Sequence, residues 1–253
     1  MPVHDLHTPI EDWARRRGDL DETVRLEVDT HRLRITTIKP STNPVKEATG
    51  SDSPSSVLFK SKYKNSTGTT QEHTFMMERQ TEATVTTSLT NGFTRNGNVG
   101  IQIRVPDDVS NATGSFGSSV SVETEDENTV KHVVSWSINS KVSAPPGQTT
   151  VAVLNIIEKK QKFTFKATVV MKGRVLVRIM DDNGTVQRVM ENDLATILDE
   201  QKFQKPPGVN VDTENRKVKW DVSGSLNFRF GVSQDVEVFY EGERSKVHPK
   251  PKV

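Results

Sequence analysis

Apolar and polar residues alternate along much of this chain, with a period of two residues. A period of two places successive side chains on opposite faces of a β-strand, and helices require a period near 3.6. Alternating or extended runs occupy residues 57–63, 72–89, 99–105, 116–122, 131–142, 149–156, 163–171, 225–230 and 235–240. The pattern therefore predicts a mostly β protein.

Helical spacing is confined to short segments. Residues 191–203 carry three apolar residues at helical spacing and predict one short helix, which ends before Pro206-Pro207-Gly208. Residues 10–16 are compatible with about two helical turns. Residues 40–56 are rich in Ser, Pro, Thr and Asn and predict a long surface loop. Asp182-Asn183-Gly184 predicts a hairpin turn, since Asn-Gly readily adopts positive φ.

Composition removes several classes of function. The 253 residues include no Cys, which excludes disulfides, thiolate zinc sites and a thiol nucleophile. Lys and Arg number 34 against 33 Asp and Glu, a net charge of +1, which argues against a nucleic-acid partner. The longest apolar stretches are far shorter than the roughly 20 residues that a membrane-spanning helix needs. Residues 1–10 lack the apolar core of a secretory signal.

A search for catalytic or metal-binding chemistry finds little. There is no phosphate-binding loop, dinucleotide fingerprint or nucleophile elbow, and the six His are scattered. We therefore expect a protein that is not an enzyme and has neither cofactor nor metal site. Residues 181–184 weakly resemble a calcium loop, but Ile179 and Met190 stand where carboxylates belong, which favours the hairpin turn. The acidic residues 123–127 fit a solvated strand end better than a cation site.

Residues 99–124 form the segment with the clearest functional meaning. Two alternating arms, 97–105 and 116–125, are joined by a polar connection at residues 106–115. Such arms suit a half-buried soluble sheet, and they also suit a membrane hairpin, whose strands need about 9–11 residues each. In a bilayer all strand edges must be paired, so one hairpin per chain implies an oligomeric barrel.

Residues 59–179 resemble the pore-forming module of the aerolysin and epsilon-toxin family. The resemblance covers nearly half of the chain continuously and depends on the order and pattern of segments around the hairpin. The segments before the hairpin are Tyr63-Lys64-Asn65-Ser66-Thr67, His73-Thr74-Phe75, Thr84-Val85-Thr86-Thr87-Ser88 and Gly92-Phe93-Thr94. The segments after it are residues 135–149, which include a proline corner, Val222-Ser223-Gly224-Ser225 and Asp235-Val236-Glu237-Val238.

The resemblance implies an elongated antiparallel β-sheet protein of aerolysin-like type. It implies a secreted or released soluble protomer that binds a surface receptor, a glycan or glycoprotein, and forms a homo-oligomer, often a heptamer. The hairpin then enters the target cell membrane and lysis follows. On this view the residues that face lipid are Val99, Ile101, Ile103, Val105, Phe116, Val120 and Val122. Those that face the lumen are Gln102, Arg104, Ser119, Ser121 and Glu123, and the tip holds Asp107, Asp108, Val109 and Asn111.

The same resemblance suggests a division of the chain. Residues 1–56 are expected to form a receptor-binding region or cap, and residues 57–253 the pore-forming module with its hairpin at about 97–125. The exposed basic residues Arg244 and Lys246 are the expected sites of activating cleavage. The alternative is a non-lytic β-rich module that binds carbohydrate or another surface.

Overall fold

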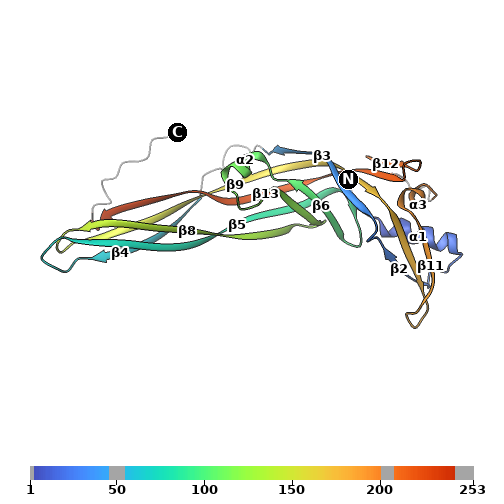
Figure 1. Cartoon of the computed structure of the whole chain (residues 1–253), viewed down its shortest axis with the longest axis horizontal. Helices are drawn as coiled ribbons and strands as arrows, with labels where there is room; N and C mark the ends of the chain where they lie inside the picture. Colours follow the sequence, from blue (N-terminus) through green and yellow to red (C-terminus); the bar gives the residue numbers. More distant parts are fainter. Residues whose placement is uncertain (1–2, 46–54, 201–207, 243–253) are drawn as a thin grey trace.

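The computed structural model describes residues 3–45, 55–200 and 208–242 and shows a long, narrow β protein (Figure 1). The strands are β1 (Val3–Asp5), β2 (Arg25–Asp29), β3 (Arg34–Pro44), β4 (Ser55–Lys64), β5 (Gln71–Thr94), β6 (Asn98–Arg104), β7 (Ser119–Thr124), β8 (Asn128–Ala144), β9 (Thr149–Lys172), β10 (Arg174–Met180), β11 (Val186–Asp193), β12 (Val209–Asp212) and β13 (Lys217–Tyr240). The helices are α1 (His7–Gly18), α2 (Asp107–Ala112) and α3 (Leu194–Glu200).

Three very long strands form the frame of the molecule. Strands β5, β9 and β13 have 24 residues each, and the large sheet has the order β1-β5-β13-β9-β3. Strand β13 pairs antiparallel with β9 along nearly its whole length, from Lys217 opposite Lys172 to Tyr240 opposite Thr150. Apart from the short parallel pairing of β1 with β5, the described ladders are antiparallel. The predicted fold class, mostly antiparallel β, is confirmed.

Half of the long sheet separates into two layers, which we call the arm. Strand β5 pairs with β13 only as far as Thr84 opposite Arg229, and beyond this point it pairs with β8 alone. The arm therefore packs the β5–β8 pair on the β13-β9-β4 sheet. A separate apolar cluster fills the space between the layers and contains Phe75, Met77, Ala152, Leu154 and Ile156. The guanidinium of Arg79 also lies 5.3 Å from the centre of the Phe59 ring and links β5 to β4.

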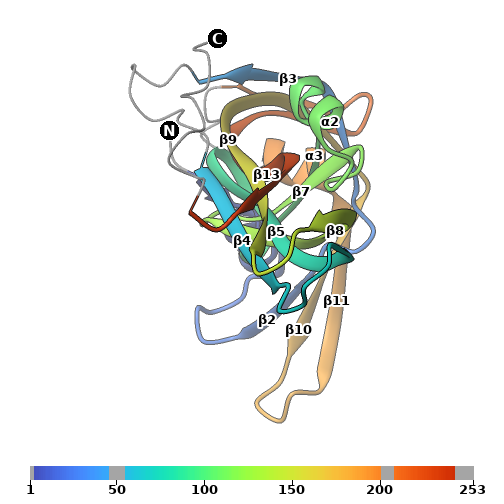
Figure 2. The same ribbon diagram turned by 90° about the vertical axis from the view of Figure 1, so that its left-hand side faces the viewer.

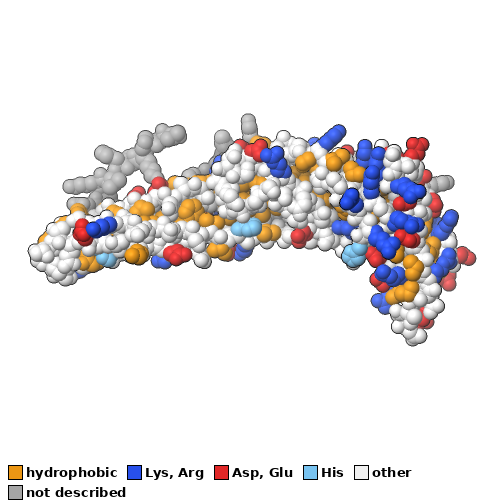
Figure 3. Space-filling view, in the orientation of Figure 1, with side chains coloured by type: hydrophobic (Ala, Val, Ile, Leu, Met, Phe, Trp, Pro, Cys, Tyr) orange, Lys and Arg blue, Asp and Glu red, His pale blue; other side chains and the backbone are white. Residues whose placement is uncertain are grey.

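The opposite end of the molecule, which we call the head, contains α1, α3 and the β11-β10-β2 sheet. Seen along the arm, the β10–β11 hairpin projects to one side of the long axis (Figure 2). The indole N–H of Trp13 in α1 donates to Glu200 at the end of α3, at 2.8 Å, and thereby ties the two helices together. On the face seen in Figure 3, charged side chains gather mainly over the head.

The N-terminal elements do not form a sheet of their own. Strand β1 pairs with β5, β2 pairs with β10, and β3 pairs with β9. The proposed boundary at residue 56 falls within β4. A receptor-binding or capping role for residues 1–56 stays a prediction, and so does cleavage at Arg244 and Lys246, which lie outside the described residues.

The structure differs from the sequence-based expectations in three elements. The described residues hold three short helices, whereas the sequence predicts one. Helix α1 is longer than the two turns expected at residues 10–16, and α2 lies in the hairpin connection, where no helix was predicted. Residues 40–44, predicted as loop, extend β3. They are tolerated there because β3 ends the path of the large sheet, where a proline without an N–H costs little. Residues 225–230 and 235–240 belong to one strand, β13, whose register shifts between Gly231 and Ser233.

Asn65 begins one of the three N-x-S/T glycosylation sequons of the chain, and its side chain is part of the fold. The side chain of Asn65 is fully buried at the end of the arm. Its amide donates to the carbonyl oxygens of Thr69 and Ala144, each at 2.8 Å, and its carbonyl oxygen accepts from the N–H of Thr67. Asn65 therefore fixes the turn after β4 and has no room for a glycan. No helix within residues 3–45, 55–200 and 208–242 is long and apolar enough to cross a membrane.

The close packing of β13 between β5 and β9 predicts a large effect for Gly224→Ala. A Cβ atom at Gly224 would lie 2.0 Å from the carbonyl oxygen of Ser88 and 2.5 Å from the Phe165 ring. We expect a loss of about 1–3 kcal/mol in the free energy of unfolding, as for overpacked cores, measured by thermal melting. Gly68→Ala is the control, because nothing lies within 4 Å of its Cβ position. Equal melting temperatures for the two variants would contradict this strand arrangement.

Candidate membrane-insertion hairpin

Strands β6 and β7 form a two-stranded sheet of their own. Their register places Ile101 opposite Val122, Ile103 opposite Val120, and Arg104 opposite Ser119. In the described part of the chain, no strand ladder joins this pair to the large sheet. The hairpin therefore lies on the large sheet as a separate layer and does not extend it.

The hairpin has one apolar and one polar face. All seven residues predicted to face lipid are at most 6% exposed, and they belong to the main apolar core. Of the residues predicted to face the lumen, Gln102, Arg104, Ser119 and Glu123 are exposed and Ser121 is half-buried. The structure thus brings the two sets to opposite faces of the hairpin. Their environment in a membrane stays a prediction.

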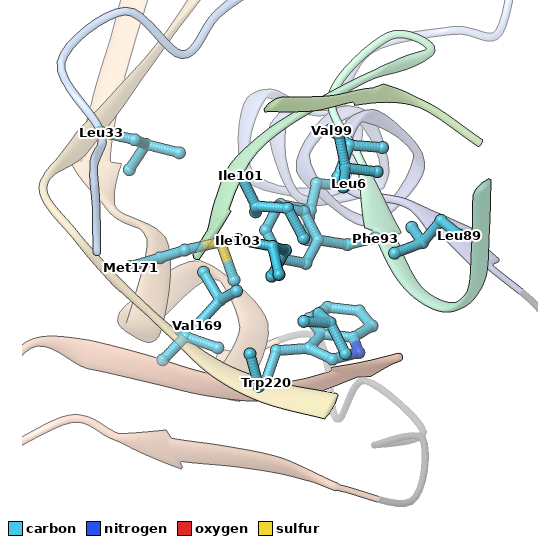
Figure 4. Close-up of a cluster of buried hydrophobic side chains, with 14 of the residues drawn as sticks. Leu6, Leu33, Leu89, Phe93, Val99, Ile101, Ile103, Val169, Met171 and Trp220 are labelled. Carbon is cyan, nitrogen blue, oxygen red and sulfur yellow. The ribbon is translucent and has the colours of Figure 1, made fainter. Parts of the chain in front are cut away.

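The apolar face of the hairpin is covered by the large sheet and by the N-terminal segment (Figure 4). The labelled cluster around Val99, Ile101 and Ile103 contains Leu6, Leu33, Leu89, Phe93, Val169, Met171 and Trp220. Burial of one large aliphatic side chain stabilises a fold by about 1.5–3 kcal/mol. The packing of these apolar side chains is therefore the main interaction that holds the hairpin on the large sheet.

Phe116 contributes to the apolar face from a turn, not from a strand. The sequence pattern places residues 116–122 in one strand, but β7 begins only at Ser119, after Gly117 with a φ of +67°. The ring of Phe116 packs edge-on against Phe228 at 5.1 Å, Phe230 at 6.0 Å and His132 at 5.7 Å. Phe116 therefore anchors the distal end of the hairpin to β13 and β8.

The predicted tip residues lie in the short helix α2. Asp107 and Asp108 occupy its first turn, where carboxylates interact favourably with the helix dipole. Val109 is fully buried and Asn111 is exposed. Arg104 pairs with Asp107 at 2.9 Å, but both side chains are more than 70% exposed, so the pair contributes little stability. The sequence signal for α2 was Pro106 followed by two Asp, a typical helix start that the turn-rich composition obscured.

Left-handed backbone conformations gather where β5 leads into the hairpin. Asn96, Gly97 and Gly100 have φ values of +53°, +77° and +63°, and the β6–β7 register shifts between Asn98 and Ile101. A Cβ atom at Gly100 would also lie 2.8 Å from the Arg95 guanidinium. Burial lowers the pKa of Arg95. These residues end β5 and turn the chain back across the sheet.

The weak calcium-loop motif is a hairpin turn in the structure. Asp181 accepts hydrogen bonds from the backbone N–H groups of Asn183 and Thr185, at 3.0 and 2.7 Å. The Thr185 bond, together with one from Gln187, holds the pKa of the Asp181 carboxyl below its usual value. Its oxygens therefore stabilise the β10–β11 turn. Within the described residues no group of three or more His, Asp or Glu is placed to hold a metal ion.

Comparison with known proteins shows the fold. No protein-family model and no curated protein matches the chain. Among solved structures, a non-toxic crystal protein from Bacillus thuringiensis is similar over 95% of this chain and 98% of that chain, with a TM-score of 0.54 and 12% identity. The β-pore-forming protein Mpp75Aa1.1 from Brevibacillus laterosporus is similar over 94% of this chain and 90% of that chain, with a TM-score of 0.46 and 11% identity.

A third similar structure is the parasporin-2 toxin of Bacillus thuringiensis, described as recognising cancer cells. The match covers 89% of this chain and 77% of the parasporin-2 chain, with a TM-score of 0.44 and 13% identity. At 12% identity, the match with the non-toxic crystal protein shows a common fold and not a common activity. The chain shares the fold of that non-toxic crystal protein, and this fold is of the mostly antiparallel β class that the sequence resemblance implies.

The two faces of the hairpin predict different thiol reactivities in the folded protein. Because the chain has no Cys, Ser119→Cys and Val120→Cys each introduce a single thiol. Ser119 is exposed and Val120 is 5% exposed, so a water-soluble maleimide should label position 119 much faster than position 120. Equal labelling rates in the folded variants would contradict the placement of the hairpin on the sheet.

Proposed function

We propose that this protein is a β-barrel pore-forming protein, a toxin or immune effector. It binds a receptor on the target cell membrane, forms a ring of identical subunits, and inserts residues 97–125 as an amphipathic hairpin. The protein reaches the membrane as a secreted or released soluble protomer. The resemblance of the sequence to the aerolysin family suggests seven subunits and cleavage near Arg244 and Lys246.

The observation that carries this proposal is the way in which the hairpin is held. Its apolar face is buried by side-chain packing, while its strand ladder is internal to β6 and β7. The hairpin can therefore leave the sheet without breaking a ladder of the large sheet. The apolar contacts that it loses are replaced in a bilayer by contacts with lipid.

Membrane insertion also explains the need for several subunits. A bilayer offers no hydrogen-bond partners for strand edges, so two strands are stable there only as part of a closed barrel. One hairpin per subunit supplies two strands, with the seven apolar residues toward lipid. The residues Gln102, Arg104, Ser119, Ser121 and Glu123 then line a wet channel that conducts ions.

A non-lytic surface-binding module is the second candidate. The apolar face of the hairpin is part of the main core of the soluble protein, so its hydrophobicity already has a structural use. The Bacillus thuringiensis protein with the same fold is itself described as non-toxic. An experiment on membranes is therefore required to decide between the two.

Leakage from erythrocytes and dye-filled liposomes tests the proposal. We expect leakage at micromolar protein or below, before or after mild trypsin treatment, together with oligomers that resist detergent. If neither membrane leaks and no such oligomer forms, with trypsin or without it, the proposal of a pore-forming protein is wrong and the surface-binding module is favoured.

Charge in the channel gives a residue-specific prediction. Arg104→Glu should shift the selectivity of single channels toward cations, because each subunit would exchange a positive lumen charge for a negative one. The soluble fold should keep its melting temperature, since Arg104 is exposed and its ion pair with Asp107 is weak. Arg188→Glu is the matched control, because Arg188 is exposed in β11, outside the hairpin. Unchanged selectivity in Arg104→Glu would show that Arg104 does not line the channel.

A further inference from the structure

The outer face of β9 carries a row of lysines in the middle of the molecule. Phe163, Phe165 and the other odd-numbered residues up to Met171 are in the core, so the even-numbered residues between 160 and 172 point to the opposite face. This row contains Lys160, Lys162, Thr164, Lys166, Thr168, Val170 and Lys172. All four lysines are exposed, and the row is about 40 Å long at 3.3 Å per residue.

Cations of the neighbouring strands widen this row into a face. Lys172 lies opposite Arg34 of β3 and Lys217 of β13, so the three side chains share one side of the sheet. Lys219 is exposed and lies two residues after Lys217 in β13, so its side chain lies on the same face of the sheet. We call the surface formed by these residues and the row on β9 the lysine face.

Most cations of the lysine face have no ion-pair partner among the residues that the structure describes. Lys217 pairs with Asp212 at 3.0 Å. Among the described residues no carboxylate lies within ion-pair distance of the remaining cations, which are Arg34, Lys160, Lys162, Lys166, Lys172 and Lys219. The whole chain has a net charge of only +1. The charge is therefore distributed unevenly, and this face attracts anions.

A hollow in the lysine face adds polar groups between the cations. Its volume is about 410 Å³, and its polar lining residues are Lys39, Asn91, Lys166, Thr168, Asp221 and Ser223. The hydroxyl of Thr168 donates to Asp221 at 2.7 Å, which orients the carboxylate at the surface. Hydroxyl, amide and carboxylate groups of this kind form hydrogen bonds with sugar hydroxyls, while the flanking lysines attract sulfate groups.

We propose that the lysine face binds a sulfated polysaccharide. A long row of cations without ion-pair partners in the described part of the chain, together with a polar hollow, matches a linear chain that carries both sulfate and hydroxyl groups. A lipid surface fits less well, because membrane-docking faces combine cations with exposed apolar side chains. The large apolar side chains that are exposed in the described residues lie elsewhere, on β4, β5, β8, β11 and the arm end of β13. This inference rests on the proposed function in one respect only: it names the chemical class of the receptor that the pore-forming protein would bind.

Binding to immobilised heparin tests this inference without any membrane. The wild-type chain should be retained on the column at 0.15 M salt and should elute as the salt concentration rises. At 0.15 M salt the Debye length is about 8 Å, so contacts between charges that lie closer than this are still effective. The test variant replaces Lys160, Lys162, Lys166 and Lys172 by Gln. We expect its affinity to fall at least about tenfold, because four cationic contacts with a polyanion are lost.

The control variant replaces four other exposed lysines by Gln and so makes the same change in net charge. These are Lys60, Lys64, Lys131 and Lys141 on β4 and β8. The control should bind heparin within about twofold of the wild type, since close contacts outweigh net charge at this ionic strength. Thermal melting verifies that both variants are folded.

The inference is overturned if the wild type is not retained at 0.15 M salt, if the two variants are weakened equally, or if desulfated heparin is bound equally well. Binding to phosphatidylserine vesicles without binding to heparin would assign the face to lipid and would also overturn it. Because no leakage is measured, failure of heparin binding leaves the pore proposal standing, and failure of leakage leaves the polysaccharide site standing.

Discussion

The packing of the hairpin's apolar face on the large sheet is the contact on which this structure depends. Seven apolar side chains between Val99 and Val122 are kept from water, and the core formed by β5, β9 and β13 covers them. The same residues close the core over Val169, Met171 and Trp220. Hairpin and sheet therefore shield each other's apolar side chains from water.

This arrangement buries the hairpin without joining it to the large sheet by a strand ladder, which is the property that the proposed insertion requires. Its ladder is internal, its base contains three left-handed residues, and its tip is a helix of six residues held mainly by Val109. The burial of the apolar face limits the variants that can test the proposed insertion. Ile103 is fully buried, so a charge at this position would destabilise the folded protein and would confuse any effect on insertion. Substitutions on the polar face separate the two effects better.

Much of the fold was predictable from alternation, because a period of two is the direct consequence of strand geometry. The strands around residues 72–89 and 163–171, the Asn-Gly turn and the two faces of the hairpin were all visible in the pattern. The continuity of β13 was not, because Gly231 looks like the end of a strand. Its Cβ position lies 2.4 Å from the Trp136 ring, a tertiary contact that leaves room only for glycine.

The lysine face shows where sequence reasoning stops. The alternation at residues 163–171 predicted a strand, but it did not show that the lysines of this strand form part of a larger cationic surface. The hollow beside Lys166 and the row that Lys172 shares with Arg34 and Lys217 depend on the pairing of β3, β9 and β13, which are distant in the sequence. Helix α2 and the turn at Phe116 were missed for a similar reason, because their apolar residues find partners only after the chain has folded.

Thiol labelling of the membrane-bound oligomer tests the central claim most directly. Single Cys variants at Ile101, Gln102, Ile103 and Arg104 are compared with one water-soluble and one lipid-soluble maleimide, before and after binding to membranes. We predict that positions 101 and 103, shielded in the soluble protein, become reactive only toward the lipid-soluble reagent, while positions 102 and 104 react with the water-soluble one. If all four positions keep the labelling rates of the soluble protein after membrane binding, the hairpin does not leave the sheet and the account is contradicted.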